Sequence, residues 1–201
     1  MKIQCGTCGA EQTVLNPVAV SVQCPYCDAI SLLVDKEWTR TGKKSRLSQG
    51  FSRLYRGAFC RIEGVEYQIV GRVRYSFGRG FWDEWFSLTE MGKGVWITED
   101  DHTFAVQQRV EATDITKQQG KVSLHDEVSV EGRTYRITEM GKAVCLGLEG
   151  ELPKEILPDE QYDYADGTSL DGDYALGIEY DDEPPTVFIG RWIHPREITI
   201  L

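Results

Sequence analysis

The feature that most constrains the fold is a set of four cysteines within the first thirty residues. They form two Cys-x-x-Cys pairs separated by fifteen residues: Cys5 and Cys8, then Cys24 and Cys27. Two such turns joined by a short hairpin place four thiolates in a tetrahedron, an arrangement that suits one Zn²⁺. We therefore predict that residues 1–34 form a zinc ribbon, with short strands at residues 13–15 and 18–22.

Two other uses of these cysteines fit the sequence less well. A thioredoxin-like redox pair needs one Cys-x-x-Cys in a βαβ setting, and a pair of disulfides implies an oxidising compartment. No secretory signal peptide precedes Cys5 and no apolar run is long enough to span a bilayer, so we expect a cytoplasmic protein without a transmembrane segment. Because sulfur fills all four positions of the predicted site, the zinc is expected to be structural. The remaining Cys60 and Cys145 lie in apolar stretches and are expected to be buried thiols.

The net charge of −10 is unevenly distributed along the chain. Residues 35–56 carry seven bases against two acids, whereas residues 57–201 carry fourteen bases against twenty-eight acids. We interpret residues 35–56 as a solvated basic connector with a helical turn or two near residues 48–55. The alternative is peripheral contact of residues 36–56 with an anionic membrane surface or an acidic partner. The acidic body argues against nucleic-acid binding, which would need a broad basic face.

From residue 57 onward the pattern is typical of a β-protein, because short alternating apolar runs are bounded by turn residues. Residues 62–69 match residues 130–137 at an offset of 68, and residues 89–93 match residues 138–142 at an offset of 49. Hairpin turns are predicted at both copies of the second repeat. We therefore predict a mainly β fold: the zinc ribbon, the connector, and a β-rich domain at 57–201. That domain is expected to consist of two related hairpin-built units, small barrels or sandwiches, at about 57–115 and 120–201.

Six stretches resemble the bacterial domain-of-unknown-function family 4178: residues 67–75, 82–88, 95–100, 162–166, 172–180 and 187–191. The resemblance covers about residues 57–201, and Trp82-Asp83-Glu84-Trp85 is its most specific part. Members of the family often carry an N-terminal zinc ribbon, and the family has no established enzymatic activity. Its genes are often grouped with phage-shock-type membrane-stress proteins and polyamine-synthase-like proteins. The resemblance thus implies an accessory role in bacterial envelope stress, in the cytoplasm or peripherally at the inner membrane.

The Trp82-Asp83-Glu84-Trp85 block places two acids next to each other. On a strand, Trp82 and Glu84 would share one face while Asp83 and Trp85 share the other, so the acids are not expected to form a catalytic carboxylate pair. One interpretation places a tryptophan in the core and gives the acids hydrogen-bonding roles. The other is a protein-partner contact formed by the block together with Trp96. No catalytic residue is predicted, because the three histidines are scattered and no phosphate-binding loop or Gly-x-Ser-x-Gly motif is present.

Residues 149–183 contain thirteen acids and one base, and we interpret them as a solvated acidic loop interleaved with tyrosines. An alternative is a surface for a cationic partner such as a polyamine, bound through ion pairs and cation–π contacts. For the whole chain, the leading hypothesis is a non-enzymatic adaptor that binds a protein partner in a membrane-stress system. A second hypothesis is an enzyme, or a protein that binds a small polyamine-like cation, with a pocket between the β-units. A third is nucleic-acid binding through the ribbon and connector.

Overall fold

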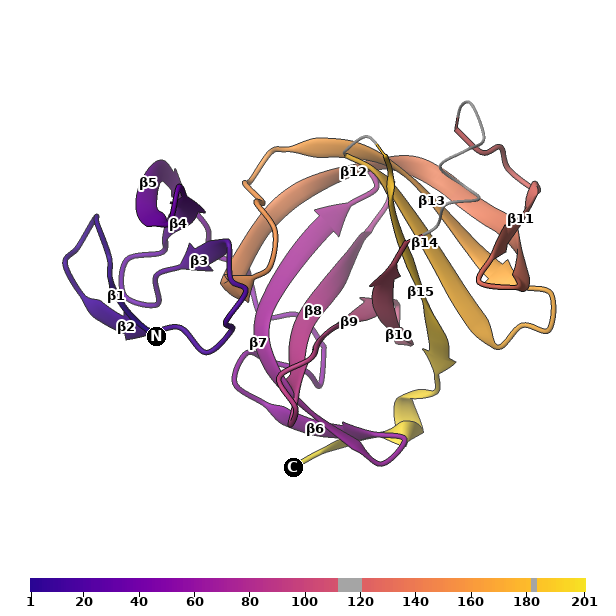
Figure 1. Cartoon of the computed structure of the whole chain (residues 1–201), viewed down its shortest axis with the longest axis horizontal. Coiled ribbons are helices and arrows are strands. Elements are labelled where there is room, and N and C mark those ends of the chain that lie inside the picture. The colour runs from indigo at the N-terminus through magenta and orange to yellow at the C-terminus, as the bar shows by residue number, and fades with distance from the viewer. Residues whose placement is uncertain (112–120, 182–183) are drawn as a thin grey trace.

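The computed structural model describes residues 1–111, 121–181 and 184–201, and strands dominate it (Figure 1). The predicted mainly β fold is confirmed: the described residues contain sixteen strands and a single 3-10 helix, η1 (Pro195–Glu197). No helix in these ranges has the length and hydrophobicity needed to cross a membrane. Residues 112–119, for which the sequence pattern was ambiguous, and part of the predicted acidic turn at 181–185 lie outside the described residues.

Five short strands build the N-terminal ribbon: β1 (Lys2–Gln4), β2 (Glu11–Thr13), β3 (Ser21–Gln23), β4 (Ala29–Val34) and β5 (Glu37–Lys44). β1 pairs with β2, and β3, β4 and β5 form a second antiparallel sheet. The strands predicted at 13–15 and 18–22 are displaced. Residues 14–20 form no strand because the backbone N–H groups of Leu15 and Asn16 donate to the carboxylate of Glu151, at 2.8 and 2.6 Å, rather than to a neighbouring strand.

The first part of the predicted basic connector is a strand and not a solvated linker. Asp35 and Lys36 have positive φ values of 50° and 69° and form the two-residue turn of the β4–β5 hairpin. β5 is exposed along most of its length, which explains why its sequence lacks apolar alternation. Residues 45–56 then cross to the second domain without the predicted helical turns.

The second domain is a closed antiparallel barrel flanked by short strands. Its elements are β6 (Phe59–Ile62), β7 (Val65–Ser76), β8 (Phe81–Thr89), β9 (Gly94–Asp100), β10 (Thr103–Val110), β11 (Glu127–Val130), β12 (Arg133–Leu152), β13 (Gln161–Ser169), β14 (Tyr174–Tyr180), β15 (Thr186–Ile193) and β16 (Ile198–Ile200). Eight of them form the ring β7-β8-β9-β10-β15-β14-β13-β12, which closes where β12 pairs with β7. Figure 1 shows β12 as the long arch along the top of the barrel. Two register shifts, at Ile137/Glu139 and Cys145/Gly147, let this strand bend as it passes from one neighbour to the other.

The two sequence repeats have different structural outcomes. Residues 62–69 and 130–137 form equivalent hairpins, β6–β7 and β11–β12, each with a Glu-Gly turn at positive φ. β7 to β10 supply one half of the barrel and β12 to β15 supply the other. The two related units therefore form a single barrel together. The second repeat is not equivalent: residues 89–93 connect β8 to β9, whereas residues 138–142 lie inside β12, and the hairpin turn predicted there is wrong. Gly92 has φ +74°, but Gly141 is needed for space, because a Cβ there would lie 2.9 Å from the ring of Tyr164.

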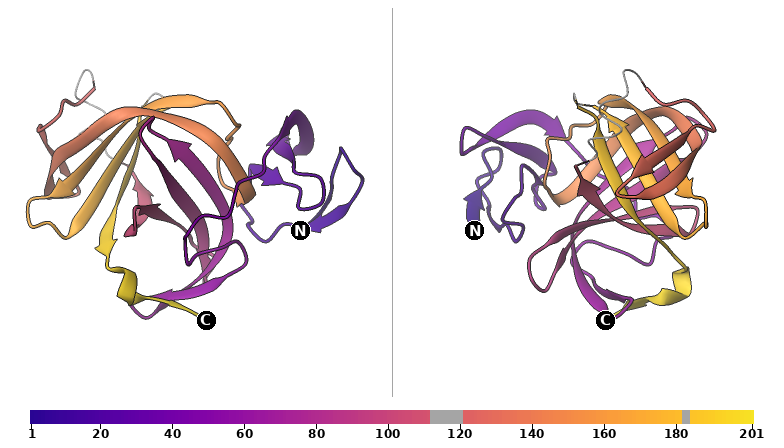
Figure 2. Two further views of the ribbon diagram at one scale, coloured as in Figure 1. Left: turned by 180° about the vertical axis from the view of Figure 1, so that it is seen from behind. Right: turned by 45° about the vertical axis from the view of Figure 1, so that its right-hand side comes forward.

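The ribbon packs directly against the barrel (Figure 2). β3 pairs with the end of β12, where Ser21 lies opposite Leu152 and Val22 opposite Glu151. Ile30 of β4 is only 1% exposed and belongs to the same hydrophobic cluster as Leu152 of the barrel. A strand pairing and a shared apolar cluster thus hold the two units together.

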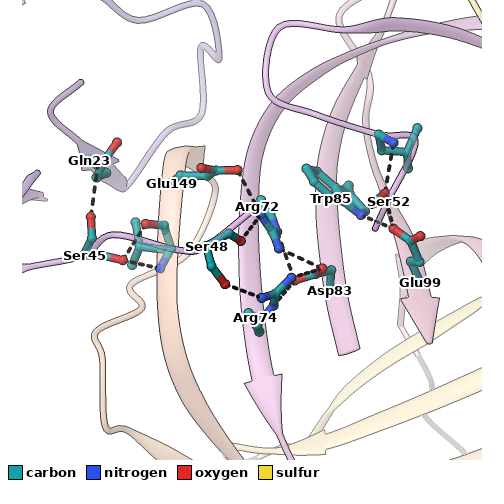
Figure 3. Close-up of polar contacts among 12 residues, drawn as sticks. Gln23, Ser45, Ser48, Ser52, Arg72, Arg74, Asp83, Trp85, Glu99 and Glu149 are labelled. Carbon is teal, nitrogen blue, oxygen red and sulfur yellow. Dashed lines mark hydrogen bonds and ion pairs between the residues drawn. The ribbon is translucent and has the colours of Figure 1, made fainter. Parts of the chain in front are cut away.

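Buried polar contacts fasten the segment between ribbon and barrel to the outer wall (Figure 3). Ser45 Oγ donates to the carbonyl of Leu148 and accepts from its N–H, both at 2.6 Å. Further along, Ser52 Oγ donates to Glu99, which also accepts from Trp85 Nε1 at 3.0 Å. These contacts give residues 45–52 a fixed path, although they form no helix or strand.

Candidate functional site

The four N-terminal cysteines converge as predicted. Their Sγ atoms all lie within 4.8 Å of one another. The two turns that carry them are built alike: the N–H of Gly9 donates to Cys5 O at 2.9 Å, and the N–H of Asp28 donates to Cys24 O at 3.0 Å. Both Gly9 and Asp28 have positive φ, which returns the chain after each pair of thiols.

The sulfur geometry fits a four-thiolate metal site. The Sγ atoms of Cys5 and Cys27 are 3.7 Å apart, and those of Cys8 and Cys24 are 3.8 Å apart. A tetrahedron with Zn–S bonds of about 2.3 Å has edges of about 3.8 Å, so these separations match a bound Zn²⁺. The four residues can therefore hold a metal ion, and with four sulfur ligands they would leave no open position for a substrate.

The Trp82-Asp83-Glu84-Trp85 block lies on β8 and alternates across the barrel wall. Trp82 and Glu84 face the interior, and Trp85 joins an apolar cluster on the opposite face. Trp82 is 9% exposed, Trp85 1% and Trp96 8%, so none of the three tryptophans offers an exposed contact surface. The structure thus assigns these rings to the core and to the barrel interior.

Asp83 belongs to a buried cluster of ion pairs on the outer face of the wall (Figure 3). Its two carboxylate oxygens accept hydrogen bonds from both Arg72 and Arg74, at 2.8 to 3.0 Å. All three side chains are nearly inaccessible, and Glu149 supplies a second carboxylate at 3.4 Å from Arg72. The backbone carbonyl of Ser48 also accepts from Arg72, so the cluster ties the inter-domain segment to β7 and β8. Among the described residues, no buried side-chain nitrogen or oxygen of this cluster lacks a hydrogen-bond partner.

A cavity of about 320 Å³ lies inside the barrel, and seven strands, β8 to β10 and β12 to β15, contribute to its wall. An eight-stranded barrel is just wide enough to be filled by its own side chains or to hold one small ligand. Here the wall includes Ala105, Ala175 and Gly177, whose small size leaves the interior unfilled. A Cβ on Gly177 would lie 3.5 Å from Asp166 Oδ1 and 3.6 Å from Gln107 Nε2, so Gly177 preserves open space beside a carboxylate.

Aromatic rings and carboxylates line this cavity together. The aromatic residues include Trp82, whose ring centroid is 5.2 Å from that of Tyr164 and 5.4 Å from that of Tyr75. The acidic residues are Glu84, Asp100, Asp101, Glu139, Asp166 and Glu179, and no lysine or arginine lines the cavity among the described residues. Rings and anionic oxygens are the two groups that proteins use to bind ammonium ions.

Three of these acids, the exposed Asp100 and Asp166 and the half-buried Glu139, are called the outer carboxylates below. Among the described residues none of them forms an ion pair, unlike Glu179. Asp166 shares an inward face of β13 with Tyr162 and Tyr164, so its exposed surface faces the cavity. The hydroxyl of Tyr164 donates to Glu139 at 3.0 Å and fixes that carboxylate at the cavity wall.

The crowding of acids shifts their proton affinities. Enclosure within the barrel keeps bulk water from Asp166 and raises its pKa to about 8, and the nearby Glu139 and Glu84 carboxylates add to the shift. Burial and the charge of Glu179 raise the pKa of Glu84 to about 7. The pKa of Asp100 is raised as well, by burial and by Glu139. Near neutral pH these carboxyl groups therefore hold protons more readily than carboxyl groups in water do.

The other chemically reactive side chains do not contribute to a site. Burial raises the pKa of the Cys60 thiol to about 11 and that of Cys145 to about 12, so neither is a ready nucleophile. His102, His125 and His194 are exposed and do not line the cavity.

Comparison with protein-family models matches residues 56–195 to the domain of unknown function DUF4178. The chain belongs to this family. The matched range contains every residue that lines the cavity and none of the four clustered cysteines, so in this chain the cavity lies within the DUF4178 domain and the thiol cluster lies outside it. Searches of curated proteins and of solved structures returned no match.

Sequence reasoning found the thiol cluster but missed most of the DUF4178 cavity. Residues 149–183 are not a solvated acidic loop, because they contain the end of β12 and the whole of both β13 and β14. The alternation Tyr162-x-Tyr164-x-Asp166 was the available signal, since residues spaced by two share one face of a strand. The high acid content of this stretch concealed that signal.

Proposed function

We propose that the DUF4178 domain of this chain is a non-enzymatic binding barrel for a small organic cation that carries an ammonium group. The proposal rests mainly on the outer carboxylates, which face a cavity of about 320 Å³ without a basic partner among the described residues. Several carboxylates this close together are unfavourable unless they bind protons or a cation. An ammonium ion would satisfy them through charge-assisted hydrogen bonds.

The aromatic wall fits the remainder of such a ligand. Trp82 and Tyr164 form an adjacent pair of rings beside Glu139, which accepts from Tyr164. A cation over an indole or phenol face gains about 0.5–2 kcal/mol, depending on how well water is excluded. Alkyl groups of the ligand would contact the same rings, and a cavity of this size suits a molecule of a few carbon atoms.

This proposal takes the place of the adaptor hypothesis as our leading interpretation. The adaptor hypothesis relied on Trp82, Trp85 and Trp96 as partner contacts, and all three are buried. A protein partner on another surface, and a link to membrane stress, stay hypotheses of the sequence analysis. For the ribbon we propose a structural role of one Zn²⁺, because a unit of five short strands has little apolar core of its own and metal binding would supply folding free energy.

Calorimetric titration of the intact chain with butylamine tests the binding proposal, with 1-butanol as its uncharged counterpart. We expect heat and a raised melting temperature with butylamine only. In the Asp166→Asn/Glu139→Gln variant the affinity should fall about tenfold or more, since two charge-assisted contacts are weakened. Asp171→Asn is the matched control, because Asp171 is exposed and lies outside the cavity. Equal binding of butanol, or no binding of any small amine, would refute the proposal.

A further inference from the structure

A lysine of the chain already places an ammonium group against two wall residues of the cavity. Lys154 Nζ lies 2.5 Å from Glu179 Oε2 and 3.6 Å from Asp181 Oδ2. It also lies 5.5 Å from the ring centroid of Tyr162. Glu179 and Tyr162 both line the cavity, whereas Lys154 contacts them but does not line it. A cation next to carboxylates and an aromatic ring is thus present in the protein without any ligand.

The backbone at Lys154 is held in place by the ribbon. Ser21 Oγ donates to the carbonyl of Lys154 at 2.7 Å and accepts from the N–H of Ile156 at 3.1 Å. Ser21 itself is fully buried and lies in β3, which pairs with β12. Because the two peptide groups that follow Lys154 are bonded to one buried hydroxyl, the backbone at Lys154 cannot shift without breaking a contact between ribbon and barrel.

The cavity is therefore electrostatically asymmetric. At one end, Glu84 and Glu179, called the inner carboxylates below, share the field of the Lys154 ammonium. The outer carboxylates have no comparable base among the described residues. A ligand with an ammonium group at each end of a short chain would bring its second ammonium toward Glu179, which already pairs with Lys154.

We infer that Lys154 is a specificity-determining residue: it already pairs with the carboxylate that a second ligand cation would need, so a second ammonium group on the ligand adds no affinity. This inference rests on the proposed function. In the complex that we infer, the outer carboxylates bind the ligand's ammonium group, and the rings of Trp82 and Tyr162 contact its uncharged part. Lys154 takes the place of a second ligand cation. Removal of the lysine charge would convert the cavity into a site for linear diamines.

The test compares butylamine with 1,4-diaminobutane, two probes of equal chain length, by calorimetry on the intact chain. In the unaltered protein the two dissociation constants should agree within about threefold, because the second ammonium gains no free carboxylate. In Lys154→Met, which keeps the aliphatic stem, the diamine should bind about tenfold more tightly or better than butylamine. Lys142→Met is the control, since Lys142 pairs with Asp163, which does not line the cavity, and its loss should leave the ratio unchanged.

Several outcomes would overturn the inference while leaving the binding proposal intact. One is a diamine that binds the unaltered protein tenfold more tightly than butylamine, and this result needs no variant to fold. Another is a folded Lys154→Met variant with an unchanged ratio of affinities. Failure of both probes to bind both proteins would instead refute the proposed function itself.

Discussion

Ser21 and Lys154 are separated by 133 residues, yet Ser21 Oγ donates a hydrogen bond of 2.7 Å to the carbonyl oxygen of Lys154. Ser21 lies on β3, three residues before Cys24 of the thiol cluster. The side chain of Lys154 pairs with Glu179 at the barrel cavity. The two candidate sites are therefore connected through a single buried hydroxyl and the β3–β12 pairing. A folded ribbon should therefore stabilise the barrel.

Loss of the metal should loosen the ribbon and lower the stability of the whole chain. The purified protein is expected to contain about one zinc per chain, and Cys5→Ser/Cys24→Ser should contain less than about a tenth of that, because two of four thiolate ligands are lost. Elemental mass spectrometry and thermal unfolding measure both effects. A reductant without a chelator is the control and should change neither. Full zinc content in the double variant would contradict the four-cysteine site.

Stability without ligand should fall as the pH rises through neutrality. The folded-state pKa values of Asp166 and Glu84, about 8 and about 7, lie above the values near 4 that these groups have in an unfolded chain. Between about pH 4 and pH 8 the folded protein therefore binds more protons than the unfolded one, and the free energy of unfolding decreases with pH. Urea titrations at pH 5, 6, 7 and 8 measure the slope.

The variant Asp166→Asn/Glu84→Gln should flatten this slope, because neither amide titrates. It should also abolish the release of protons that we expect when butylamine binds near pH 7.5, a release that calorimetry in buffers of different ionisation enthalpy detects. A free energy of unfolding that increases between pH 6 and pH 8 in the unaltered protein would show that these carboxylates do not carry raised pKa values.

Filling the cavity at Gly177 should block binding without unfolding the barrel. The nearest atoms to an added Cβ lie at 3.5 and 3.6 Å, which is ordinary contact, and the backbone there is not left-handed. Gly177→Ala should keep or raise the melting temperature, because alanine restricts the unfolded chain more than glycine does. Gly177→Val should then lower the affinity for butylamine by about tenfold or more as its branches occupy the space beside Asp166. Unchanged affinity in a folded Gly177→Val variant would place the ligand elsewhere.

Removal of Asp83 should be among the most destabilising polar substitutions in the chain. Asp83→Ala leaves the guanidinium groups of Arg72 and Arg74 buried together, with Glu149 as the nearest remaining carboxylate. Breaking a buried ion pair in this way costs about 3–5 kcal/mol. Asp163, a partly exposed carboxylate that pairs with Lys121 and Lys142, provides the comparison, and Asp163→Asn should destabilise the protein far less because water screens its ion pairs. Equal losses in urea unfolding would refute this role of Asp83.

The features that the sequence predicted correctly are those that depend on residues close together in the chain. The spacing of the four cysteines was sufficient for the thiol cluster, because each pair sits on one turn. The repeat of residues 62–69 at 130–137 was sufficient for two equivalent hairpins, since the Glu-Gly turns adopt positive φ in both. Alternation in the Trp82-Asp83-Glu84-Trp85 block also placed its side chains correctly on opposite faces of β8.

The features that the sequence concealed depend on strands that are distant along the chain. Gly141 has the sequence context of a turn glycine, but the ring of Tyr164 from β13 occupies the space over it and the strand continues. Lys154 is the one base among thirteen acids in residues 149–183, and the fold brings it beside Glu179 of β14, twenty-five residues away. The cavity could not be read from the sequence because seven strands contribute to its wall.

The pairing of β3 with β12 also governs the order in which the chain can assemble. The ribbon leaves the ribosome before the barrel does, but β12, the barrel strand with which it pairs, ends at Leu152. The ribbon therefore cannot dock until most of the barrel has been synthesised. Until then the apolar side chain of Ile30 lacks its barrel neighbours, and contacts of such long sequence separation form slowly. A metal that folds the ribbon early would protect the nascent chain during this interval.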